Sequence, residues 1–133
     1  FQGTSIADAA ISPDGKALAL WHAVEDDRGE LVVVPSSGGE PRVLAELEAG
    51  DWDWYGIGWH PASGEIYFPK GPENGLRELM RIAASGGEPK KTGIQFESIR
   101  SVVFQPSGNK LAFQGSETKQ EIWVMENFLS ASR

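Results

Sequence analysis

The clearest run of side chains that could do chemistry is acidic: Glu25, Asp26 and Asp27 follow one another, and Arg28 comes next. Closely spaced carboxylates are oxygen ligands of the kind that Ca²⁺ takes. This spacing matches no calcium-binding loop, however, and runs of charge are generally exposed to solvent. We therefore interpret residues 25–28 as the solvated tip of a hairpin without a metal ion, and as one part of a candidate partner-binding surface.

A second group of functional side chains is aromatic: Trp52, Asp53, Trp54 and Tyr55 stand together in the chain. Aromatic residues beside charges are typical of the few residues that dominate binding to a protein or a peptide. The alternative is that the rings pack inside the protein, because aromatic side chains usually bury their large area. We take these four as candidate partner-binding residues and keep the packing alternative open.

The two histidines of the chain are His22 and His60. A catalytic zinc ion usually needs about three protein ligands. Two histidines far apart in the chain are therefore weak evidence for a zinc site. His60 precedes Pro61 as Ser12 precedes Pro13, so we expect His60 to make a hydrogen bond within a turn. We predict no metal site and no catalytic histidine.

Motifs of known catalytic and cofactor sites are missing from the sequence. It contains no Gly-X-Ser-X-Gly nucleophile elbow, and neither a phosphate-binding loop nor a dinucleotide-binding fingerprint. We therefore predict that this chain has no catalytic activity of its own and needs no cofactor.

The candidate residues lie between elements that repeat along the chain. Gly-Gly-Glu-Pro occurs at residues 38–41 and 86–89, each time after a short apolar run. Turn sequences containing proline and glycine follow Ile11, Trp59 and Phe104. Proline presets φ, glycine tolerates positive φ, and the β-branched residues between such turns favour strands. The apolar runs before the two Gly-Gly-Glu-Pro turns begin at Glu30 and Glu78. A third run of the same kind begins at Glu121.

The spacing of these repeats predicts the fold. Pro13, Pro61 and Pro106 recur every 45 to 48 residues, and each unit has room for four strands. A period in the forties with four strands is typical of a β-propeller blade. We predict an all-β protein, a partial β-propeller of about three four-stranded antiparallel blades over residues 5–51, 52–98 and 99–129. The last blade has no Gly-Gly-Glu-Pro and no room for its fourth strand.

The repeat resembles that of the TolB-type, WD-repeat-like propellers of bacteria. The resemblance rests on Pro13-Asp14-Gly15-Lys16, the strand and apolar run that follow, and Gly-Gly-Glu-Pro. The middle copy departs from it, with His60-Pro61-Ala62-Ser63-Gly64-Glu65 at the turn. The resemblance implies a scaffold that binds a protein or a peptide. Because similar repeats form the gate of prolyl-oligopeptidase-like enzymes, the alternative is an accessory propeller of a larger peptidase.

The variable loops indicate which face would bind. In a propeller, the connections between second and third strands share a face with those between blades, and the repeated turns share the other face. The variable loops are expected over residues 23–29, 70–75 and 115–120, with connections between blades over 48–55 and 93–98. Loops on a rigid scaffold usually carry function, so we place the binding face there.

Composition excludes some partners. The 133 residues carry a net charge of −7, and the isoelectric point is near 4.8. Such a chain is a poor match for nucleic acid, whose phosphates need clustered Lys and Arg. No apolar run is long enough to insert into a membrane. The absence of cysteine fits the periplasm and the cytoplasm of a bacterium alike, so we assign no compartment.

Three blades are fewer than a closed propeller needs. Two open faces and unpaired strand edges would favour association, so we expect a homo-oligomer in which two chains close a ring of six blades. Phe1-Gln2-Gly3 resembles the end of a protease-cleavage site left by an affinity tag, so residues 1–3 are set apart from the propeller of residues 4–133.

Overall fold

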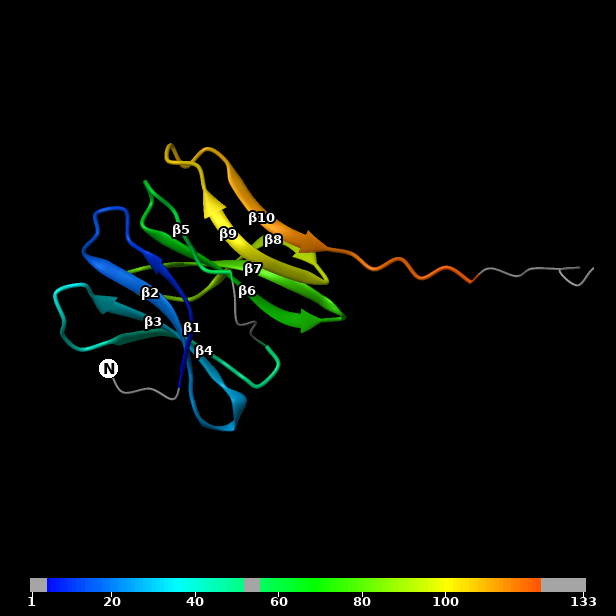
Figure 1. Ribbon diagram of the computed structural model, residues 1–133, viewed down its shortest axis with the longest axis horizontal. Helices are drawn as coiled ribbons and strands as arrows, with labels where there is room; N and C mark the ends of the chain where they lie inside the picture. The colour runs from blue at the N-terminus through cyan, green and yellow to red at the C-terminus, as the bar shows by residue number, and fades with distance from the viewer. Residues whose placement is uncertain (1–4, 52–55, 123–133) are drawn as a thin grey trace, which may run out of the picture.

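The computed structural model describes residues 5–51 and 56–122, which form ten β-strands and one short 3-10 turn. The strands build three antiparallel sheets, arranged one after another along the chain (Figure 1). Within these ranges, no helix is long and apolar enough to cross a membrane. The predicted all-β class, with blade-like antiparallel sheets, is confirmed.

The first sheet has four strands in the order of the chain. They are β1 (Ser5–Ile11), β2 (Ala17–Ala23), β3 (Gly29–Pro35) and β4 (Arg42–Leu47). The pairing of β2 with β3 is unbroken from Ala17 opposite Pro35 to Ala23 opposite Gly29. Because side chains alternate between the two faces of a strand, this register sends Trp21 to one face and Leu20 to the other.

The second sheet repeats this order with its own four strands. They are β5 (Gly58–Trp59), β6 (Glu65–Glu73), β7 (Leu76–Ala83) and β8 (Lys90–Phe96). Its two central strands keep the register of the first sheet: Lys70 lies opposite Glu78, as His22 lies opposite Glu30. Equivalent positions of the two sheets can therefore be compared residue by residue.

The third sheet has two strands in the described part of the chain, β9 (Ser98–Phe104) and β10 (Leu111–Ser116). The sequence predicted a third strand beginning at Glu121. Glu121 and Ile122 belong to no strand, and the side chain of Ile122 is 95% exposed. The rest of the predicted strand, residues 123–125, lies outside the described residues, as do residues 1–3. The expected strand is therefore not formed at Glu121 and Ile122.

Two connections are shorter than predicted. The loop expected over residues 70–75 is reduced to Asn74 and Gly75, because β6 runs to Glu73 and β7 begins at Leu76. Both turn residues have positive φ, 52° and 79°, which is the geometry of a tight two-residue hairpin. Likewise, the expected 93–98 connection is the single residue Glu97. In both places strands extend into residues where a connection was expected.

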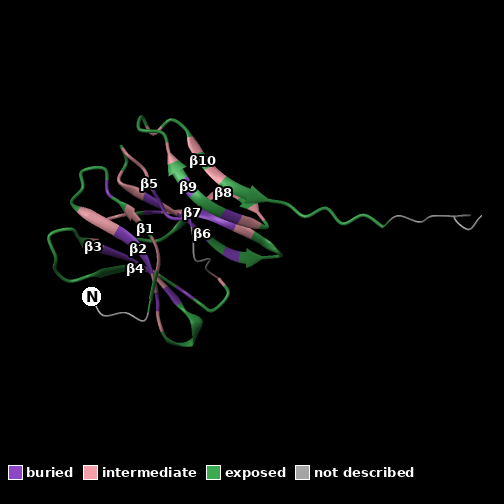
Figure 2. Cartoon of the chain, in the orientation of Figure 1, coloured by how far each residue is buried: buried purple, intermediate pink, exposed green. Residues whose placement is uncertain are grey.

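The core lies between the sheets, as the central band of buried residues in Figure 2 shows. Between the first and second sheets, Trp21 meets Phe68 edge to face, with ring centroids 5.7 Å apart. Between the second and third sheets, Leu79, Ile99 and Val102 form a smaller cluster. Burial of apolar side chains from facing sheets is what holds successive blades together.

Candidate functional site

The acidic residues 25–28 lie at the turn between β2 and β3, where Glu25–Asp27 form the 3-10 turn. All four are exposed, and the backbone nitrogen of Val24 donates to the carbonyl of Arg28 at 2.9 Å to close the turn. The prediction of a solvated hairpin tip is confirmed. Within residues 5–51 and 56–122, no group of three His, Asp or Glu side chains is placed to hold a metal ion.

The aromatic group of Trp52, Asp53, Trp54 and Tyr55 lies outside the described residues, so its role stays a prediction. The chain on both sides of it is held in place. The carbonyl of Asp51 accepts a hydrogen bond from the nitrogen of Gly71 at 2.8 Å. After the gap, the nitrogen of Gly56 donates to the carboxylate of Asp8 at 2.7 Å.

The repeated turns hold a polar network of their own. In the first turn, Asp14 Oδ1 accepts from Ser12 Oγ at 2.7 Å and from the nitrogen of Lys16 at 3.0 Å. These hydrogen bonds stabilise the ionised carboxylate, so they lower the pKa of Asp14 below its ordinary 3.8. Asp14 therefore stabilises the turn.

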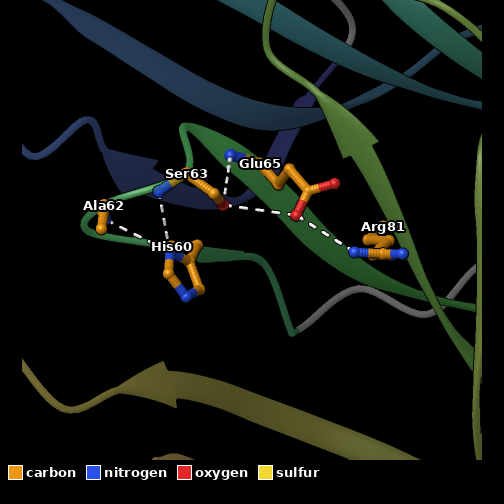
Figure 3. Close-up of polar contacts among 5 residues, drawn as sticks. All are labelled: His60, Ala62, Ser63, Glu65 and Arg81. Carbon is orange, nitrogen blue, oxygen red and sulfur yellow. Dashed lines mark hydrogen bonds and ion pairs between the residues drawn. The ribbon is translucent and has the colours of Figure 1, made fainter. Parts of the chain in front are cut away.

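The histidines take structural positions. His22 Nδ1 lies 3.2 Å from Glu30 Oε2, across the β2–β3 pair. The predicted turn hydrogen bond of His60 is confirmed: its Nδ1 accepts from the nitrogens of Ala62 at 3.2 Å and Ser63 at 3.0 Å (Figure 3). Because Nδ1 accepts, the neutral ring carries its proton on Nε2.

The ring of His60 also joins the second and third sheets. It contacts Phe104 edge to face at 4.9 Å between centroids and stacks on Tyr67 at 6.3 Å. A Cβ added at Gly108 would lie 2.7 Å from His60 Cε1, which shows how closely the third sheet's turn approaches the ring. His60 is therefore a packing residue as well as a turn residue.

Ser63, Glu65 and Arg81 lie beside His60. A serine beside a histidine could be a nucleophile and its base. Ser63 Oγ donates to Glu65 Oε2 at 3.3 Å, and the same carboxylate meets Arg81 at 3.4 Å (Figure 3). His60 is bonded to the backbone nitrogen of Ser63 and not to its hydroxyl. A nucleophile and its base need that hydroxyl contact, so this group stabilises the turn and β-strand pair.

A cavity of about 260 Å³ lies at the opposite end of the second sheet. Its lining includes Asp51, Lys70, Pro72, Glu78, Met80 and Lys91. We call it the second-sheet cavity. It lies where β6 ends and β7 begins, on the side of the molecule away from the β1–β2, β5–β6 and β9–β10 turns (Figure 1). The sequence predicts a variable loop at this place, but nothing in its pattern indicates the cavity.

The most buried polar side chain of this cavity is Glu78, which is 6% exposed. Its Oε1 accepts from the nitrogen of Gly93 at 2.7 Å, and its Oε2 accepts from Gln95 Nε2 at 2.6 Å. Both donors are neutral. The carboxylate is thus held against β8, although Lys70 lies directly opposite on β6.

The wall of the cavity at Gly71 is fixed by close backbone contacts. Gly71 has φ of +111°, and an added Cβ would lie 2.9 Å from the nitrogen of Glu73. Its carbonyl accepts a hydrogen bond from the guanidinium of Arg77. These contacts, with the bond to Asp51, keep the end of β6 bulged away from β7 and so shape the cavity.

The same place in the first sheet is nearly closed. A hollow of about 20 Å³ remains there, lined among others by Val24, Arg28 and Glu30. His22 bonds to Glu30 across the strands, whereas its counterpart Lys70 forms no such bond with Glu78 among the described contacts. The second-sheet cavity is therefore a property of this sheet and not a general consequence of the repeat.

Comparisons with known proteins identify the architecture. No family model matches the chain. The uncharacterised protein Atu1656 of Agrobacterium fabrum is 26% identical over 117 residues, which cover 87% of this chain and 38% of that protein. TolB from Acinetobacter baumannii superposes with a TM-score of 0.68 at 20% identity, covering 84% of this chain and 27% of TolB.

A second solved structure is the β-propeller domain of the Trilobed protease from Pyrococcus furiosus, described as having an open velcro topology. It has a TM-score of 0.65 at 17% identity and covers 86% of this chain and 35% of that one. The chain thus spans about a third of the length of these relatives. The protein has a β-propeller fold that is similar in structure to TolB and to the propeller domain of this protease.

Proposed function

We propose that this protein is a β-propeller scaffold that binds a protein or a peptide, with no catalytic activity of its own. The carrying observation is the second-sheet cavity, which lies on the face where the connections differ between sheets and has the buried carboxylate of Glu78 in its lining. The repeated turns of the other face serve the fold, as the bonds of Asp14 and His60 illustrate. Binding sites are typically hollows with a few well-placed polar groups.

The proposed binding face combines the cavity with two groups of candidate residues. Glu25, Asp26, Asp27 and Arg28 lie at the β2–β3 turn, at the same end of the sheets as the β6–β7 turn (Figure 1). Trp52, Asp53, Trp54 and Tyr55 follow directly after Asp51, which lines the cavity. We propose that the partner contacts the cavity together with residues of these two groups.

A selection experiment tests this proposal. Peptides selected from a displayed library against the folded chain would be titrated into ¹⁵N-labelled protein, and the perturbed backbone amides would be assigned. We expect the shifts to concentrate at residues 25–28 and 70–78. Shifts concentrated at the opposite turns, residues 12–16 and 60–65, or a failure to select any binding peptide, would refute the proposal.

A second candidate is an accessory propeller that gates or presents substrates for a peptidase. The structural likeness to the propeller domain of the Pyrococcus protease supports it. Assay of the full-length natural protein for hydrolysis of peptides separates the two functions. Hydrolysis that stops when the propeller is deleted favours the accessory role, and a full-length protein that binds but does not hydrolyse favours the scaffold.

We also propose that two copies of this chain associate to close a six-bladed ring. Apolar side chains on the first and third sheets support this: Ile6, Ile11 and Val103 are 56%, 67% and 58% exposed. Exposed apolar surface on the first and last of the three sheets favours association. Light scattering after size exclusion should give the mass of two chains, and the mass of one chain would refute this arrangement.

A further inference from the structure

We propose that the second-sheet cavity receives one cationic side chain, a lysine or an arginine, of the bound partner. The inference rests on the proposed function, because it specifies the chemistry that the binding face would recognise. Four observations support it. They are the size of the cavity, the burial of the Glu78 carboxylate among neutral donors, the pairing of the other charged side chains, and the apolar surface beside Glu78.

The size of the cavity suits a single side chain. Its volume of about 260 Å³ is below the usual range of small-molecule sites, which begins at roughly 300 Å³. This space is sufficient for one extended side chain of a partner.

Glu78 supplies the charge that a cation would meet. The carboxylate is 6% exposed and is bonded to two neutral donors, Gly93 and Gln95. Burying a carboxylate is costly unless an opposite charge accompanies it. Each of its oxygens has a further lone pair, so an incoming ammonium or guanidinium group can be accepted without breaking either existing bond.

The other charges of the cavity leave it negative. Lys91 is already paired with Glu73, at 3.5 Å. The side chains of Asp51 and Lys70 make no hydrogen bond or ion pair with any described residue. Three carboxylates thus face two ammonium groups, which favours a cation over an anion.

The apolar surface beside Glu78 suits the stem of a long basic side chain. Met80, 7% exposed, forms part of the lining, and Pro72 lies at the rim. Lysine and arginine bury their methylene groups along such surfaces while the charged end reaches a polar partner. The first sheet offers no equivalent, because its hollow of about 20 Å³ is too small for a side chain.

The test uses three short capped peptides, acetyl-Gly-X-Gly-amide with X as arginine, glutamine or glutamate, titrated into ¹⁵N-labelled protein. The amides of Gly71 and Gly93 and the side-chain amide of Gln95 report on the cavity directly. We expect saturable shifts at these groups with the arginine peptide and none with the other two.

Two substitutions with opposite expected effects test whether the cavity prefers a cationic side chain. Glu78→Gln keeps the shape, with its oxygen accepting from Gly93 and its NH2 donating to the Gln95 oxygen once that amide turns over. It should weaken binding of the arginine peptide about tenfold, since it removes a charge-assisted bond. Lys70→Gln should strengthen binding several-fold, because it removes a nearby like charge from an exposed position. Glu88→Gln, on an exposed residue at the opposite end of the sheet, is the matched control and should change nothing.

Each outcome bears on the proposal. Equal binding of the glutamine peptide, binding of the glutamate peptide, or weaker binding in Lys70→Gln overturns the cationic site. If a library-selected peptide maps to residues 70–78 and is indifferent to Glu78→Gln, the binding function stands and this inference fails. If the arginine peptide binds as expected and no selected peptide reaches this face, the inference stands and the proposed function fails.

Discussion

Asp8 Oδ2 accepts a hydrogen bond from the backbone nitrogen of Gly56 at 2.7 Å, and a second one from Ile57 at 3.1 Å. The first strand of the first sheet is thereby tied to the chain that enters the second sheet. The two residues hold the same place in their repeats, 48 residues apart. One carboxylate thus holds the first strand of the first sheet against the chain that enters the second sheet.

Asp8→Ala should lower the free energy of unfolding by about 1–3 kcal/mol, because two backbone donors lose a charged acceptor. Urea unfolding monitored by tryptophan fluorescence measures the change. Glu40→Ala, which removes an exposed carboxylate from a turn, is the control and should leave the midpoint nearly unchanged. An Asp8→Ala midpoint equal to the control's would mean that the two bonds add nothing to stability.

We expect the contribution of Asp14 to the free energy of unfolding to depend on pH. Its pKa is lowered in the folded state, chiefly by the Ser12 hydroxyl and next by the nitrogen of Lys16. A lowered pKa means that the stabilisation is complete above the unfolded value of 3.8 and is lost as the pH falls through the folded value. The stability difference between wild type and Asp14→Asn should therefore be present at pH 6 and shrink below about pH 4. A difference that stays constant down to pH 3, in urea titrations, would contradict this assignment.

His60→Ala should destabilise the protein by about 1–3 kcal/mol, since it removes an acceptor for two turn nitrogens and a ring packed on Phe104. His60→Asn supplies a short side-chain oxygen that can accept from the same turn nitrogens, but not the ring. We expect it to recover part of the loss in thermal unfolding. Full recovery would show that the ring contacts contribute nothing, and no recovery would show that the turn bonds contribute nothing.

Gly58→Ala should destabilise the contact between the second and third sheets by about 1–3 kcal/mol, the usual cost of overpacking. A Cβ at this position would lie 2.6 Å from Val102 Cγ1 and 2.9 Å from the Val102 carbonyl oxygen. Val102→Ala in the same chain relieves the first clash and not the second, so rescue should be partial. Calorimetric unfolding checks this, and a stable Gly58→Ala protein would mean that the third sheet packs elsewhere.

The fold could be predicted from the sequence because the residues that determine it are close together in the chain and repeated. Proline and glycine at Pro13-Asp14-Gly15 and in Gly-Gly-Glu-Pro restrict φ at each turn, so the strands between them follow. The connections predicted at residues 70–75 and 93–98 were wrong, because strands occupy most of both ranges. Tertiary pairing outweighs local composition at such positions, because each residue added to a strand satisfies its backbone donors and acceptors.

The candidate cavity shows what the sequence by itself could not decide. Glu30 and Glu78 are both glutamates and hold equivalent positions in the repeat, so the sequence gives no reason to expect different surroundings for them. Glu30 pairs across to His22, whereas Glu78 turns to Gly93 and Gln95 and leaves a hollow beside Lys70. The sequence determined the repeat, its turns and its strands, since these depend on residues close together in the chain. Only the tertiary structure decided which of two equivalent carboxylates lines an open cavity, because that depends on packing between strands and sheets distant in sequence.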